Sequence, residues 1–219
     1  MLFDFLRELK ANNKREWFNM NRDRYIADVR APLLAFIAAF RPRLLDISPH
    51  IVADPKPTGG SMFRIYRDTR FSKNKEPYKT MASAFFFHQT GGKDGPGLYL
   101  HLEPDNCFMG AGLYHPDTAS RTKVTDAIST KPGAWRDITT GNGFRRLLTM
   151  AGDSLAKMPK QYDPQHPFAE DLKRKDFIVV THFSETQACA KDFIERFNNF
   201  SRVSAPYLKF IMKAAGLKL

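Results

Sequence analysis

Three side chains that can transfer protons or bind a ligand alternate along one short apolar segment. Tyr99, His101 and Glu103 lie two residues apart in the stretch G-L-Y-L-H-L-E-P (97–104). Alternate residues of a β-strand point to the same face, so a strand here would place all three side chains together. A histidine beside a carboxylate can act as a general acid or base, and a tyrosine can orient a ligand. We therefore predict these three as catalytic residues.

The next segment adds an empty space to this face. Residues 107–114 predict the second strand of a hairpin that turns at 105–106. A two-residue turn places Gly110 opposite the histidine and Gly112 opposite the tyrosine. Glycine inside a strand often marks a place where a ligand or another backbone comes close. Tyr114 ends the same face, which we interpret as the floor of a pocket.

A second group of residues suits an anion. The segment 63–79 contains six basic residues and only two acidic ones, with aromatic residues between them. Arginine matches carboxylate or phosphate with two hydrogen bonds, and lysine adds a point charge. The predicted ligand-binding residues are Arg64, Tyr66, Arg67, Arg70, Lys73, Lys75, Tyr78 and Lys79, together with Tyr114 of the hairpin. Whether residues 67–80 fold over the sheet or away from it stays open.

The motifs that identify common activities are missing. The sequence has no phosphate-binding loop of the form G-x-x-x-x-G-K-[ST], no G-x-G-x-x-G, no H-E-x-x-H and no C-x-x-C. His101 and Glu103 alone are too few for a catalytic metal site, which usually has three protein ligands. We therefore predict no metal site and name no cofactor, and the residues leave open whether the chain is an enzyme.

The composition is that of a folded protein with excess positive charge. The 219 residues include 34 Lys and Arg against 23 Asp and Glu, a net charge of +11. Such a charge suits anionic metabolites or nucleic acid. There is no apolar run of about 18 residues to span a membrane, and the two cysteines are no disulfide framework. We expect a cytoplasmic protein without a membrane partner.

Three functions stay open at this point. The leading hypothesis is an enzyme or binding domain for a small phosphate- or carboxylate-bearing ligand, held by the basic segment above the hairpin. The second is a nucleic-acid-binding protein, in which aromatic residues such as Phe71 stack on bases. The third is an interaction scaffold without a ligand, which would have a flat, filled sheet face. The oligomeric state is open as well.

The elements that must position these residues follow from apolar periodicity. Helical spacing predicts helices at the N-terminus, over 22–45, 118–129 and 143–158, and after Ser184. Short aromatic or aliphatic runs predict strands at 62–66, 81–88 and 177–183 beside the hairpin. The prediction is one α+β domain over 1–219, helical in 1–47, sheet-forming in 62–115 and mostly helical in 118–219, with one further strand near 177–183. Helices from both terminal thirds would pack on a central, mostly antiparallel sheet.

Several segments together resemble a known family. These are F-R-I-Y-R-D-T-R-F-S-K-N-K-E-P-Y-K (63–79), G-L-Y-L-H-L-E-P (97–104) and G-A-G-L-Y-H-P (110–116). They are similar to an uncharacterised family of bacteria and fungi, domain of unknown function twenty-four sixty-one. The segment 159–177 is similar to a later motif of that family, and Trp17-Phe18 followed by Tyr25 also fits. The resemblance implies one domain of family length and carries no activity, cofactor or catalytic residue.

Overall fold

The computed structural model describes all residues, 1–219, around one six-stranded sheet. In spatial order the strands are β1 (Ile51–Val52), β2 (Ala82–His88), β3 (Gly97–Leu102), β4 (Cys107–Leu113), β6 (Phe177–Phe183) and β5 (Thr149–Ala151). All neighbouring strands are antiparallel. The predicted α+β class, with helices packed around a central antiparallel sheet, is confirmed.

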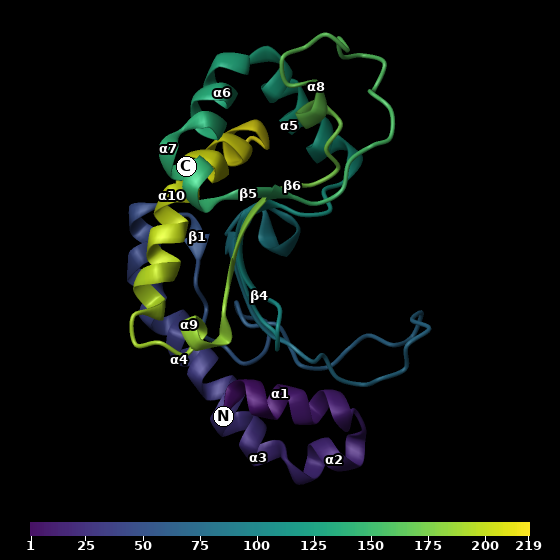
Figure 1. The fold of residues 1–219 in the computed structure, drawn as a ribbon, viewed down its shortest axis with the longest axis vertical. Helices are drawn as coiled ribbons and strands as arrows, with labels where there is room; N and C mark the ends of the chain where they lie inside the picture. Colours follow the sequence, from purple (N-terminus) through teal and green to yellow (C-terminus); the bar gives the residue numbers. More distant parts are fainter.

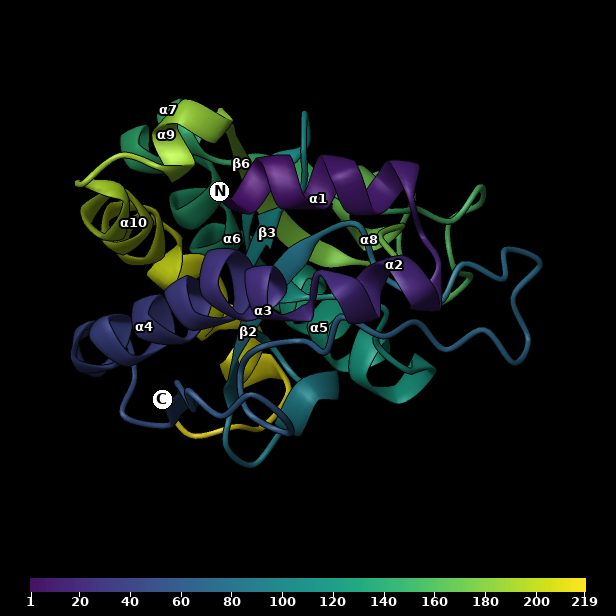
Figure 2. The same cartoon turned by 90° about the horizontal axis from the view of Figure 1, so that it is seen from below.

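Helices from both ends of the chain surround this sheet (Figure 1). The N-terminal ones are α1 (Leu2–Ala11), α2 (Arg15–Met20), α3 (Arg22–Tyr25) and α4 (Ala31–Phe40). The later ones are α5 (Thr118–Thr130), α6 (Pro132–Thr140), α7 (Asn142–Leu147), α8 (Ala169–Leu172), α9 (Glu185–Ala188) and α10 (Phe193–Ala214). Helices α4 and α10 lie side by side against one face of the sheet (Figures 1 and 2). No helix combines the length and apolar character that a membrane crossing needs.

Aromatic side chains join the two covering helices to the sheet. Phe197 of α10 lies with its ring centroid 4.7 Å from that of Phe40 on α4 and 5.6 Å from that of Phe86 on β2. All three side chains are completely buried. Aromatic rings bury large apolar areas and gain from edge-to-face contacts. The leucines of β3, Leu98 and Leu100, complete this core face.

The hairpin register differs from the prediction by two residues. Strands β3 and β4 are joined by four residues, 103–106, in which Asp105 has a positive φ of 63°. Tyr99 therefore pairs with Gly110, and His101 pairs with Phe108. A shift of two residues keeps every side chain on its original face because the strand period is two. The prediction of opposing pairs was wrong, whereas the division of the hairpin into two faces is confirmed.

Two further predicted elements were wrong. The expected helix over 143–158 ends at Leu147, because residues 149–151 pair with β6 as an edge strand. The expected strand over 62–66 is reduced to two isolated bridges, one between Met62 and Ala84 and one between Tyr66 and Tyr78. In both places tertiary pairing with a longer strand decided the backbone conformation, and local propensity did not.

The buried aromatic contact predicts a large stability loss on truncation. Replacing Phe197→Ala removes the ring that contacts both α4 and β2, so we expect a loss of about 3–5 kcal/mol in the free energy of unfolding. Urea denaturation measures it. The matched control is Phe71→Ala, because that ring is 96% exposed, and its effect is expected to stay within about 0.5 kcal/mol. Equal effects of the two variants would contradict the assignment of the core.

Candidate functional site

The face of the sheet opposite α4 and α10, named here the open face, carries three rows of side chains. Each row crosses β2, β3, β4 and β6 in that order. The rows are Ser83, His101, Phe108 and His182; Phe85, Tyr99, Gly110 and Val180; and Phe87, Gly97, Gly112 and Ile178. Glycines occupy the centre of the second and third rows. The missing side chains leave a hollow in the middle of the face.

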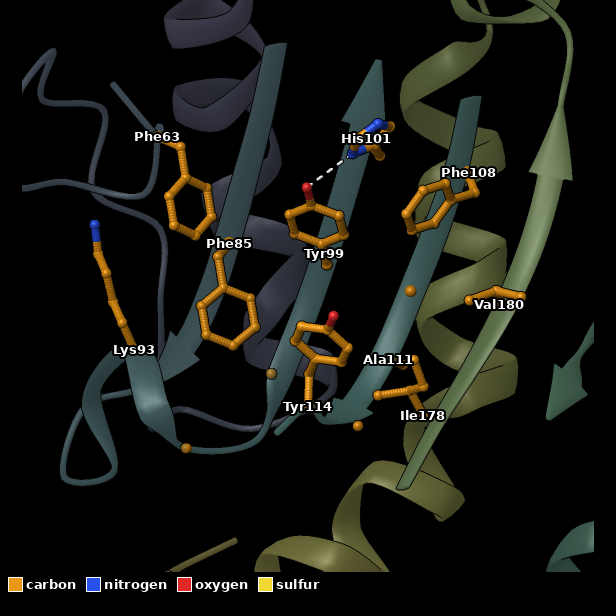
Figure 3. A pocket seen from close by; sticks show the side chains of 14 residues that line it. Phe63, Phe85, Lys93, Tyr99, His101, Phe108, Ala111, Tyr114, Ile178 and Val180 are labelled. Atoms are coloured by element: carbon orange, nitrogen blue, oxygen red, sulfur yellow. Dashed lines mark hydrogen bonds between the residues drawn. The ribbon is translucent and has the colours of Figure 1, made fainter. Parts of the chain in front are cut away.

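That hollow is a pocket of about 440 Å³ (Figure 3). Its lining comprises Phe63, Phe85, Lys93, Gly95, Gly97, Tyr99, His101, Phe108, Gly110, Ala111, Gly112, Tyr114, Ile178 and Val180. A mostly apolar lining with a few polar groups, in this range of volume, is typical of small-molecule sites. The sequence prediction that the hairpin glycines leave space above the sheet is therefore confirmed as geometry.

Two of the glycines are required by the fold itself. Gly112 has φ of +130°, and a Cβ atom there would lie 2.0 Å from the carbonyl oxygen of Phe177. A Cβ atom on Gly97 would lie 2.3 Å from the carbonyl oxygen of Phe86. Side chains at these two positions would collide with neighbouring backbone, so both glycines serve close strand packing.

A chain of hydrogen bonds joins the three predicted catalytic side chains. The Tyr99 hydroxyl lies 2.8 Å from Nδ1 of His101, and Nε2 of His101 lies 3.2 Å from Oε2 of Glu103 (Figure 3 shows the first contact). An ionised carboxylate can only accept hydrogen bonds. Nε2 of His101 therefore carries the ring proton and donates a hydrogen bond to Glu103. Nδ1 is then the acceptor, and the Tyr99 hydroxyl donates to it. The alternation read from the sequence thus produces a directed chain.

Burial and the chain itself set the protonation states. Burial lowers the pKa of His101, and the hydrogen bond and charge of Glu103 offset part of this effect. Burial likewise raises the pKa of Tyr99. Partial burial acts to raise the pKa of Glu103, but hydrogen bonds from Asn106 and His101 outweigh it and lower that pKa. The resting site therefore holds a neutral imidazole between a protonated tyrosine and a carboxylate.

Three cations, Arg64, Lys79 and Lys93, lie close together beside the pocket, and Lys93 is the one that lines it. The Nζ atoms of Lys79 and Lys93 lie 5.3 and 5.2 Å from the ring centroid of Phe63, and Arg64 is the next residue along the chain. Burial, and then the charges of Arg64 and Lys93, lower the pKa of Lys79. None of the three cations forms a salt bridge with an acidic side chain.

Lys93 is a pocket residue that the sequence analysis missed. It lies in the short 3₁₀ turn Gly92–Asp94 between β2 and β3, and its side chain extends along the β2 edge towards Phe63 (Figure 3). Nothing in the residues next to Lys93 sets it apart among the 34 lysines and arginines of the sequence. Its place in the turn before the predicted active-site strand was the one available indication.

Most of the predicted anion-binding segment lies away from the pocket. Residues 67–77, named here the arm, project from the body of the molecule (Figure 2), and main-chain pairing of Tyr66 with Tyr78 closes the base. Nearby groups already hold several arm cations: Arg67 pairs with Glu76, Arg70 with Asp68, and Lys75 donates to the carbonyl of Thr69. Lys73 is exposed. The arm therefore does not close over the sheet.

The three predicted tyrosines divide between the pocket and the base of the arm. Tyr114 lines the pocket and is largely exposed, with its ring stacked on that of His115. Tyr66 and Tyr78 instead contact Phe18 of α2, with ring centroids 6.2 and 4.1 Å away. These two tyrosines anchor the base of the arm to the N-terminal helices. No group of three or more histidine, cysteine or acidic side chains could hold a metal ion.

The polar chain predicts an unusual titration of His101. We expect its ring to titrate below 6.5, the ordinary value, in ¹⁵N NMR spectra that also show the proton on Nε2. The unfolded chain then binds this proton more readily than the folded chain, so this histidine contributes stability that is lost as the pH falls below about 6.5. Glu103→Gln removes the negative charge that favours imidazolium and is expected to lower the pKa of His101 further. A rise in that variant would contradict the chain.

Comparison with known proteins identifies a family and nothing finer. The family model described as "conserved hypothetical protein (DUF2461)" matches residues 1–210. Neither the comparison with curated proteins nor the comparison with solved structures found a match. The match extends from α1 almost to the end of α10 and so includes the whole sheet and its pocket. The chain therefore belongs to the DUF2461 family, as the motifs at 63–79, 97–104 and 110–116 predict.

Proposed function

We propose that the open-face pocket binds a small molecule that carries a carboxylate or a phosphate. The observation that carries this proposal is the group of Arg64, Lys79 and Lys93, three cations close together without an acidic partner. The two acidic residues of the arm, Asp68 and Glu76, are paired with other arginines. Like charges held together repel one another. A bound anion would supply the missing partner through charge-assisted hydrogen bonds.

The rest of the pocket supports a ligand with an apolar body. Phe63 and Phe85 stand on the side of the cations, and Ile178 and Val180 stand on the opposite side. Burying apolar ligand surface against these side chains favours binding. A hollow of about 440 Å³ does not fit the flat, filled face that an interaction scaffold would present.

The polar chain supports acid–base chemistry on such a ligand. A ligand proton would move to the Tyr99 oxygen while the Tyr99 proton moves to Nδ1 of His101. The products are a ligand anion and an imidazolium, and the Glu103 carboxylate stabilises the imidazolium. Tyr99 ends the step protonated, so no phenolate accumulates, in agreement with its raised pKa. His101 acts as the base and Glu103 as the residue that orients it, the logic of other catalytic triads.

One observation favours a second candidate function, contact of the arm with nucleic acid. Phe71 is 96% exposed, and the guanidinium of Arg70 lies 5.9 Å from its ring centroid. Lys73 and Lys75 follow on the same arm. Exposed aromatic rings among cations are the usual elements of single-strand binding, because each base offers a face for stacking.

Removal of a rim cation is the test of the anion site. Lys93→Ala and Lys79→Ala are each expected to weaken binding of a stabilising anion about tenfold or more, because each removes a charged partner. Thermal shift measures the effect, since a ligand that binds only the folded state raises the melting temperature. The probes are inorganic phosphate, sugar phosphates, nucleotides and small carboxylates.

The matched control for this test is the double variant Arg67→Ala/Arg70→Ala on the arm. It removes two positive charges but leaves the pocket rim intact, so it is expected to bind as the wild type does. If it abolished binding while the Lys93→Ala variant retained it, the anion site would lie on the arm. If none of the probes stabilised the wild type, the proposed function would be wrong.

The nucleic-acid candidate has a separate test. Phe71→Ala/Lys73→Ala removes the exposed ring and one cation of the arm. If the arm binds single strands, this variant loses affinity for a labelled oligonucleotide, measured by fluorescence anisotropy, while the Lys93→Ala variant does not. Wild-type affinity should also fall steeply with salt as counter-ions are released. A wild type that shows no binding at low salt would rule this candidate out.

A further inference from the structure

The fold does not require a glycine at position 110. A Cβ atom there would lie 3.6 and 3.8 Å from Cβ and Cδ1 of Tyr99 and 3.9 Å from the carbonyl oxygen of Val179. These are ordinary van der Waals contacts. Its φ is not positive, in contrast to that of Gly112. Glycine in a strand interior normally weakens the strand. Gly110 therefore lowers the stability of β4 without improving its packing.

The space above Gly110 has aromatic side chains beside it and a flat floor beneath it. In its cross-strand row it lies between Tyr99 on β3 and Val180 on β6, with Phe85 one strand further. The floor there is peptide backbone, because Gly97 and Gly112 follow in the next row. Figure 3 shows the rings of Tyr99, Phe85 and Tyr114 standing over this part of the sheet. A thin, rigid group fits such a floor better than a branched chain.

We infer that the ligand is a planar aromatic or heteroaromatic ring that bears a carboxylate or phosphate, with the ring lying on Gly110. This inference rests on the proposed function, because the anionic substituent is placed at Lys93 and Lys79. Aromatic walls favour an aromatic guest through edge and face contacts. A rigid ring also loses little conformational freedom when it binds.

The position of the cations agrees with this orientation. Nζ of Lys93 lies 5.2 Å from the ring centroid of Phe63 and 5.9 Å from that of Phe87. Both lysines therefore stand at the β2 edge of the pocket, and the glycine floor lies on β3 and β4. A ring on the floor with its anion directed towards β2 meets the cations at one end. Tyr99 on β3 stands between Gly110 and this edge. Its hydroxyl donates a hydrogen bond to His101, and the hydroxyl oxygen can accept one from the ligand.

The first experiment compares matched ligands on the wild-type protein. AMP is compared with ribose 5-phosphate, which has the same phosphate and sugar but no aromatic base. Benzoate is compared with cyclohexanecarboxylate, which has the same carboxylate on a puckered ring. Isothermal titration calorimetry is expected to show at least fivefold tighter binding for the aromatic member of one pair or both.

The outcomes separate this inference from the proposed function. Equal binding within both pairs would keep the anion site and overturn the planar ring. Absence of binding by all four probes and by inorganic phosphate would overturn both. Tighter binding of an aromatic member that the Lys93→Ala variant reduces would support both together.

The second experiment introduces a side chain at Gly110, in the floor of the pocket. Gly110→Ala adds one methyl group where the fold has room, so the melting temperature is expected to stay at or above that of the wild type. Binding of the aromatic probe is expected to weaken at least tenfold, and Gly110→Val should weaken it further. Inorganic phosphate binding should stay unchanged in both variants.

Gly133→Ala is the matched control, because a Cβ atom there meets nothing within 4 Å and Gly133 belongs to α6, outside the pocket lining. It is expected to bind every probe as the wild type does. Unchanged binding of the aromatic probe in a folded Gly110→Val variant would overturn the inference. A loss of phosphate and aromatic binding together would also overturn it, because the floor would then act on the anion and not on the ring.

Discussion

The packing of α4 and α10 against one face of the sheet is the interaction on which the other features depend. Phe197, Phe40 and Phe86 meet there in full burial. Once that face is the core, the strand period of two places every other side chain on the opposite face. Tyr99, His101 and the glycines of β4 are therefore on the open face because Leu98 and Leu100 are in the core. The site is a consequence of where the hydrophobic side chains are buried.

The open face keeps several features that weaken a fold. A neutral histidine is buried in a polar chain, with its pKa lowered mainly by burial. Three cations at the rim lack acidic partners, and Gly110 leaves a space that the backbone does not need. Proteins tolerate such local costs chiefly at functional sites. Their coincidence in one pocket is a stronger indication of function than any of them alone.

The arm shows why a charged segment in sequence need not mark a site. Its composition suits an anion, yet the pairing of Tyr66 with Tyr78 and their contacts with Phe18 direct it away from the sheet. Local acidic residues pair with Arg67 and Arg70. Of the predicted cations of segment 63–79, only Arg64 and Lys79, which flank the base of the arm, stay near the pocket. The position of a loop depends on where its base is anchored, and composition carries no information on that anchor.

The sequence by itself determined the α+β class and the division of the hairpin into a core face and an open face, because alternation is a local property of the chain. It also determined that Tyr99, His101 and Glu103 share a face, a conclusion that survived a register error of two residues. Only the tertiary structure decided that Lys93 joins the pocket, that the arm departs from it, and that β5 replaces the end of a predicted helix. Each of these depends on contacts between residues far apart in the chain, such as Thr149 with Val180. Such contacts form only when burial of the whole core brings the segments together.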